Sequence, residues 1–127
     1  LIDRIDMYIE VPKVPTEDFQ KKYQTQEERS QDIKKRVQRA RNIQESRFSW
    51  TYLKSNSEMK TSDIKKFCIL DIEGEAILWQ AVTTMKLSAR AYYRILKLAR
   101  TIADLENSDR IQTSHLLEAL SYRKKEE

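Results

Sequence analysis

The chain has 127 residues, enough for one modest domain, and carries 24 Lys and Arg against 20 Asp and Glu, a net charge of +4. It contains one glycine and two prolines, whereas a chain of this length with average usage contains about 15 such residues. This composition excludes sandwiches and barrels, which are rich in turns. With so little glycine, one histidine and one cysteine, it can build neither a Gly-rich phosphate loop nor a zinc site of nitrogen and sulfur ligands. We therefore expect no cofactor, no metal site and no enzyme activity from this chain by itself.

Two further exclusions follow from the sequence. No apolar run approaches the roughly 20 residues that span a bilayer, so we expect no membrane contact. Cys68 has no second cysteine with which to form a disulfide, and the expected location is the cytoplasm. The lone histidine, His115, lies in a run that is typical of an ordinary helix, which favours a structural role over a catalytic one.

The first residues differ from the rest of the chain. Apolar residues alternate with polar ones from Ile5 to Val11, the period of a half-buried strand, and the prolines at 12 and 15 end it. A lone strand has no partner, so we interpret residues 1–29 as the end of a larger core followed by a polar connector.

Apolar spacing then predicts helices over about 30–48, 62–70, 72–86 and 89–106, and a last helix that Thr113 caps. Ser30, Asp71 and Ser88 are the other predicted caps, 49–60 is a predicted loop, and 124–127 is a charged tail. The prediction is an all-α fold of four to five helices around one small core. The predicted inward residues are Ile33, Val37, Ala40, Ile43, Ile64, Phe67, Cys68, Ile72, Ala76, Trp79, Val82, Tyr92, Ile95, Leu96, Ala99, Ile102, Ala103, Leu116, Leu117 and Leu120.

Arg90 occupies an unusual position for a cation. It falls in the first turn of the helix over 89–106, where the macrodipole disfavours positive charge by roughly 0.3–1 kcal/mol. Arg94 and Lys97 follow on the same face, so the pattern suits either an anion site or surface residues that tolerate the position. The basic helix over 30–48 leaves a similar choice between phosphate contacts and a solvated face.

Three stretches resemble one family. Residues 1–12 (LIDRIDMYIEVP) strongly resemble the segment that closes the ATPase core in magnesium-chelatase-like AAA+ proteins of the ComM type. Residues 87–106 resemble the signature helix after that core, and residues 111–123 resemble its final lid helix. The resemblance implies a small AAA+ lid bundle over 30–123, preceded by a short N-terminal β-strand remnant of the core.

The resemblance also implies site residues and partners. Arg4 matches the arginine finger that reaches into a neighbouring subunit's ATP site, and Arg90 matches the sensor-2 arginine. Arg94 is a second candidate for nucleotide contact, with a plain helix-surface role as the alternative for Arg94 and Arg100.

The full-length protein would then bind ATP and Mg²⁺. This chain would contact its own AAA+ core, neighbouring subunits of a ring and, as a candidate partner, DNA, with porphyrin metallation as the family alternative. The other hypothesis is a free-standing basic helical module that binds nucleic acid or a protein.

Overall fold

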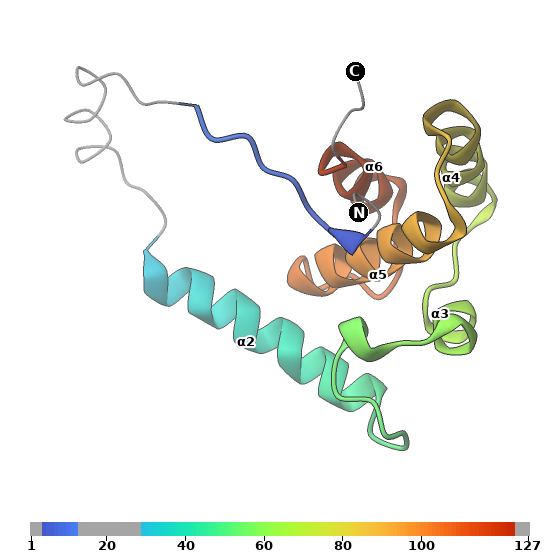
Figure 1. The fold of residues 1–127 in the computed structure, drawn as a ribbon. Coiled ribbons are helices and arrows are strands. Elements are labelled where there is room, and N and C mark those ends of the chain that lie inside the picture. Colours follow the sequence, from blue (N-terminus) through green and yellow to red (C-terminus); the bar gives the residue numbers. More distant parts are fainter. Residues whose placement is uncertain (1–3, 13–28, 124–127) are drawn as a thin grey trace.

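The computed structural model describes residues 4–12 and 29–123 (Figure 1). These residues form five α-helices and one short 3-10 helix and contain no strand, which confirms the all-α prediction. In chain order the elements are α2 (Ser30–Arg47), η2 (Asn56–Glu58), α3 (Thr61–Phe67), α4 (Ile72–Met85), α5 (Ala89–Leu105) and α6 (Thr113–Ser121).

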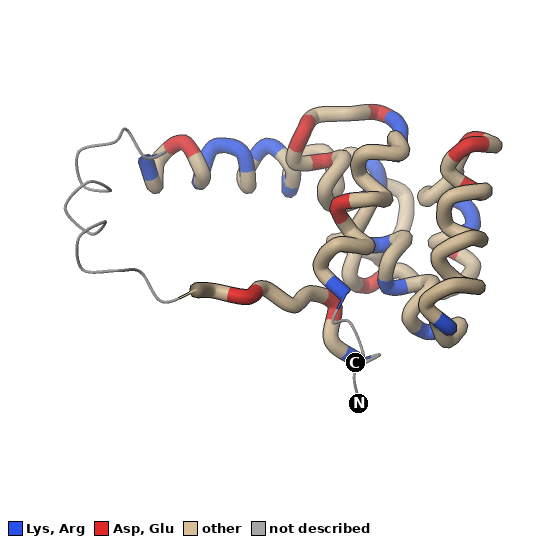
Figure 2. Tube along the Cα trace, turned by 90° about the horizontal axis from the view of Figure 1, so that it is seen from above, with Lys and Arg blue, Asp and Glu red and all other residues tan. Residues whose placement is uncertain are grey.

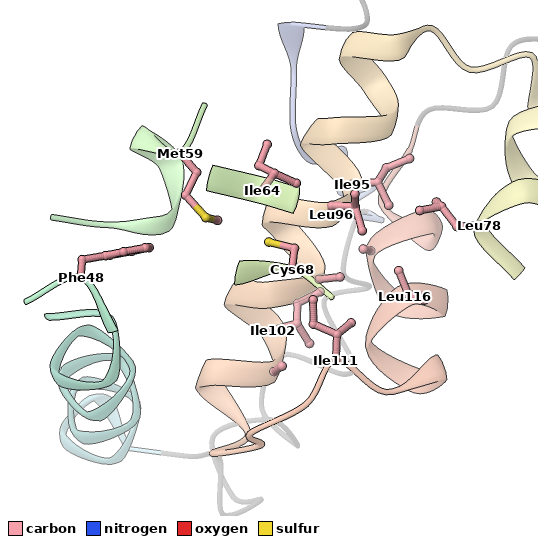
Figure 3. Close-up of a cluster of buried hydrophobic side chains, with 13 residues drawn as sticks. Phe48, Met59, Ile64, Cys68, Leu78, Ile95, Leu96, Ile102, Ile111 and Leu116 are labelled. Carbon is pink, nitrogen blue, oxygen red and sulfur yellow. The ribbon is translucent and has the colours of Figure 1, made fainter. Parts of the chain in front are cut away.

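Helix α5 lies at the centre of the bundle, because it contacts α2, η2, α3 and α6, while α4 packs on α6. In the core (Figure 3), Phe48 and Met59 lie on one side of α5, and Leu78 and Leu116 lie on the other. All six residues predicted to form the inner face of this helix lie in or against that core. The strong period of its sequence therefore predicted its orientation correctly.

The helix caps were predicted in part. Asp71 accepts a hydrogen bond from the Gly74 amide at 2.7 Å, and Ser88 accepts one from the Ala91 amide at 3.1 Å, as expected. The prediction that Thr113 caps α6 is wrong, because Gln112 holds the cap position and its amide donates to His115 Nδ1 at 2.9 Å. The prediction that Ser30 caps α2 is also wrong, because the helix begins at Ser30 and Arg29 holds the cap position without a side-chain cap bond.

Helix α4 faces the opposite way from the prediction. Its predicted inner residues Ile72 and Trp79 are 88% and 72% exposed, whereas Gly74 and Leu78 are buried. The helix is apolar on both sides, so its period does not single out one face. Gly74 decides the orientation of α4. A Cβ atom at this position would lie only 3.2 Å from Leu116 Cδ1, and because glycine has no Cβ atom, α4 can approach α6 closely.

This orientation predicts unequal costs for two adjacent truncations in α4. Leu78→Ala should lower the free energy of unfolding by about 2–5 kcal/mol, because it empties a core position. Trp79→Ala should change it by less than about 0.5 kcal/mol, since the indole is largely exposed. Urea unfolding followed by circular dichroism measures both, and a Trp79→Ala cost equal to that of Leu78→Ala would contradict the orientation.

Two other predicted inner faces are only partly buried. In α2, Ala40 is buried but Ile33 and Val37 are exposed, because the N-terminal half of the helix extends beyond the rest of the bundle (Figure 1). In α6, Leu116 is buried whereas Leu117 is exposed, since this short helix buries a narrow face. Amphipathic spacing located these helices but overestimated how much of each face the bundle covers.

The predicted strand lies partly in residues 4–12, where the structure shows no strand; residues 5–12 have no regular secondary structure, and the segment contacts α5 and the end of α6. Because its sheet would belong to an upstream core, the strand remnant stays a prediction. The rest of the connector and the charged tail lie outside the described residues. Within residues 4–12 and 29–123, none of the helices has the length and apolar composition of a membrane span.

Candidate functional site

Arg90 is the second residue of α5 and is exposed to solvent. No hydrogen bond or ion pair joins its guanidinium to any residue that the structure describes. The first turn of α5 contains no acidic residue, so no negative charge there offsets the positive end of the helix dipole. An exposed guanidinium beside this helix end is therefore suited to bind an anion such as a phosphate group.

Arg94 has a different environment from Arg90. Its Nη1 atom donates to Asp6 Oδ1 at 2.6 Å, which joins α5 to the N-terminal segment. Arg4 lies two residues before Asp6, is exposed, and has no partner among the described residues. The structure thus ties the Arg4 segment to α5, one helical turn from Arg90.

A buried ionic cluster lies near the other end of α5. The Asp104 carboxylate, which is fully buried, accepts hydrogen bonds from Arg47 at 2.6 and 2.9 Å and from Arg100 at 3.0 and 3.2 Å. The Asn56 amide donates to the same carboxylate at 2.8 Å. The alternative of a surface role for Arg100 is therefore wrong.

This buried cluster holds the predicted loop over 49–60 in place. The Asn56 backbone amide donates to Gln44 Oε1 at 2.9 Å, and Asn56 Oδ1 accepts from Arg47 at 3.1 Å. Among the described residues, no buried side-chain nitrogen or oxygen atom lacks a hydrogen-bond partner, so the cluster presents no unpaired buried group to a ligand. The sequence contained one signal of the cluster, since Arg100 and Asp104 are four residues apart among apolar residues of the inner face.

His115 is buried, and both of its ring nitrogens are occupied. Nδ1 accepts the Gln112 amide at 2.9 Å, so the ring proton lies on Nε2 and is donated to Glu106 Oε2 at 2.6 Å. The ring therefore joins the start of α6 to the end of α5. This structural role agrees with the interpretation of His115 as an ordinary helix residue.

A cavity of about 230 Å³ lies between α3, the start of α4 and α5, lined in part by Cys68, Ile69, Tyr92 and Tyr93. Neither Arg90 nor Arg94 lines it, so it is separate from the arginine pair. Burial raises the pKa of the Cys68 thiol to about 11, which keeps this side chain protonated at neutral pH. Cys68 is therefore not an activated nucleophile in this cavity.

Basic residues recur along α2 (Figure 2). Lys34, Lys35 and Arg41 are exposed on this helix. Arg39 donates to the Leu105 carbonyl at 3.0 Å, and Arg47 belongs to the buried cluster. The solvated part of α2 therefore keeps a positive surface that can meet a polyanion.

Comparisons with known proteins agree with the resemblance predicted from the sequence. The family model of the magnesium chelatase subunit ChlI C-terminal domain matches residues 27–123. The chain is 38% identical over 122 residues to the competence protein ComM of Haemophilus influenzae, and 37% identical over 122 residues to the uncharacterized protein YifB of Salmonella typhimurium. Each alignment covers 96% of this chain, which spans 23% of the length of each relative.

Proposed function

The chain belongs to the family of the magnesium chelatase subunit ChlI C-terminal domain, and we propose that it is the helical lid of a ComM-type AAA+ ATPase. In this proposal the ATPase core precedes the lid in the full-length protein, and the subunits assemble into a ring. The lid contributes Arg90 as the sensor-2 residue, and the segment before it contributes Arg4 as an arginine finger. The relatives are about four times as long as this chain, which leaves room for such a core.

The exposed, unpartnered guanidinium of Arg90 at the start of α5 is the observation that carries the proposal. During phosphoryl transfer, negative charge builds on the oxygens of the transferred group, and a positioned guanidinium stabilises it. ATP and Mg²⁺ are bound chiefly by the core in this scheme, since the described residues hold no cluster of three metal-ligating side chains. This chain then supplies positive charge to the phosphates.

Ring assembly and DNA are further parts of the proposal. An arginine finger acts across a subunit interface, so Arg4 requires a neighbouring subunit. DNA is the substrate class that the ComM resemblance implies, and the exposed lysines and arginine of α2 give it a cationic surface to meet. Stimulation of ATP turnover by added DNA in the full-length protein checks this part.

Arg90→Ala in the full-length protein tests the central claim. We expect ATP turnover to fall at least about tenfold, because a guanidinium contact to the transferring phosphate is lost. Lid stability should stay level or rise by a few tenths of a kcal/mol, since the substitution removes a cation from the positive end of α5. Steady-state ATPase assays and thermal unfolding measure the two effects.

Arg110→Ala is the matched control for this experiment. Arg110 is an exposed arginine whose guanidinium has no partner among the residues that the structure describes, and it lies in the connection between α5 and α6. Its truncation should leave turnover unchanged. Equal turnover in the Arg90→Ala variant and the unchanged protein would remove Arg90 from the ATP site.

A further inference from the structure

Three of the contacts between described residues join the N-terminal segment to the helical bundle. The Tyr8 amide donates to the Tyr122 carbonyl at 2.6 Å, and Arg123 Nη1 donates to the Ile5 carbonyl at 3.0 Å. The third contact is the ion pair between Arg94 and Asp6 at 2.6 Å. The two contacts through backbone atoms of the segment lie at the end of α6, whereas the ion pair joins the segment to α5.

The ion pair places the segment on a defined face of α5. Arg94 follows Arg90 by four residues, so the two lie on one face of the helix, about 6 Å apart along its axis. Arg4 precedes Asp6 by two residues, and two residues of chain span at most about 7 Å. The backbone of Arg4 is therefore held close to the face of α5 that carries Arg90.

The three arginines differ in what their guanidinium groups contact. Arg94 is bound to a carboxylate, and its side chain is only 20% exposed. Arg4 and Arg90 are exposed and have no partner among the residues that the structure describes. A guanidinium that is already paired with a carboxylate binds a phosphate group less strongly than an unpaired guanidinium does.

We infer that Arg94 is a positioning residue, which holds Asp6 and thereby fixes Arg4 in space relative to Arg90. This inference rests on the proposed function, because Arg4 needs an ATP site on which to act. With the segment docked, the lid and the finger segment move as one body, so any shift of α5 also shifts Arg4. Prepositioning of this kind lowers the cost of bringing a charged group to its reaction geometry.

The first experiment tests the docking on this chain and needs no nucleotide. The amide of Tyr8 exchanges with solvent only when the segment leaves the bundle, so its hydrogen-exchange rate measures docking. In Arg94→Gln or Asp6→Asn, this rate should rise by about 1.5- to 5-fold, the effect expected for a partly exposed ion pair. The double charge reversal Asp6→Arg with Arg94→Asp should restore slow exchange, and Arg110→Gln should leave the rate unchanged.

The second experiment measures ATP hydrolysis in the full-length protein. A positioning role predicts that Arg94→Gln lowers kcat by up to about fivefold with little change in the KM for ATP, and that the double reversal restores kcat. A residue that binds the nucleotide would instead raise KM, and aspartate at position 94 would repel the phosphates. An increased KM without rescue would therefore overturn the inference in favour of direct nucleotide contact.

The two experiments can fail separately. Unchanged Tyr8 exchange in Arg94→Gln would overturn the docking role, whatever the activity. Faster exchange with an unchanged kcat would show that docking does not serve turnover, which also overturns the inference. A full-length protein that hydrolyses no ATP would overturn the proposed function, while the exchange experiment would still decide whether Arg94 docks the segment.

Discussion

Asp104→Asn is expected to lower the free energy of unfolding of this chain by about 3–5 kcal/mol. The substitution removes a fully buried negative charge on which two guanidinium groups and one amide converge. Asparagine has one acceptor oxygen, and its amide group would point donors at the donors of Arg47 and Arg100. The buried guanidinium of Arg100 and the half-buried guanidinium of Arg47 are then left without an anion, which is far more costly than the loss of a single neutral hydrogen bond.

A loss of this size is a large part of the 5–15 kcal/mol that typically separates a folded domain from its unfolded state. Urea unfolding followed by circular dichroism measures it. Asp109→Asn is the control, because Asp109 is exposed and contacts Arg100 through its backbone carbonyl, which the substitution keeps. We expect the control to change stability by less than about 0.5 kcal/mol, and equal losses in both variants would contradict the structural role of the cluster.

The two ends of α5 have different environments, and in the proposed function this difference lets one helix act both as scaffold and as part of the ATP site. Toward its C-terminal end, Arg100 and Asp104 are buried and bonded to each other, and Asp104 also bonds Arg47 of α2 and Asn56 of η2. At its N-terminal end Arg90 is exposed, and Arg94 reaches out to the N-terminal segment. A helix that is fixed in the core along most of its length can present an arginine with little positional freedom, which a charge-stabilising residue requires.

The sequence predicted features that depend on neighbouring residues. The helix bounds agree with the structure to within three residues, and the caps at Asp71 and Ser88 are confirmed, because spacing and capping act within one or two turns. The orientation of α4 was predicted wrongly, since it depends on the close approach of Gly74 to Leu116, which lies 42 residues later in the chain. Periodicity within one helix carries no information about such an approach.

In the candidate site too, the sequence predicted the features that depend on neighbouring residues and missed those that depend on distant ones. The position of Arg90 in the first turn of its helix follows from Ser88 and is confirmed. The partner of Arg94 could not be predicted, because Asp6 lies 88 positions earlier in the chain and meets Arg94 only when the segment docks on the bundle. The buried cluster was missed for the same reason, since Arg47 and Asn56 reach Asp104 from two other elements. The roles of Arg4 and Arg90 in ATP hydrolysis stay predictions.

Arg4→Ala in the full-length protein is expected to lower ATP turnover by about 10³-fold or more, the scale of an arginine finger in comparable phosphoryl transfer. Arg4 is exposed and its side chain has no partner among the described residues, so its truncation opens no cavity in the bundle. The free energy of unfolding of the lid should therefore stay within about 0.5 kcal/mol of its original value. A loss of activity at unchanged stability separates a role in the reaction from a role in the fold.

A mixing experiment then tests whether Arg4 acts on the neighbouring subunit. Subunits with Arg4→Ala are mixed with subunits whose own ATP site has been inactivated in the core, so that neither population is active alone. In a ring, each head-to-tail interface joins the ATP site of one subunit to Arg4 of the next subunit. In a random one-to-one mixture, half of the subunits have an intact ATP site and the other half have an intact Arg4. If Arg4 acts across the interface, about a quarter of the interfaces therefore combine an intact ATP site with an intact Arg4. Turnover should recover toward that fraction. No recovery in mixed rings would mean that Arg4 serves the ATP site of its own subunit, and full activity of Arg4→Ala alone would remove it from the reaction.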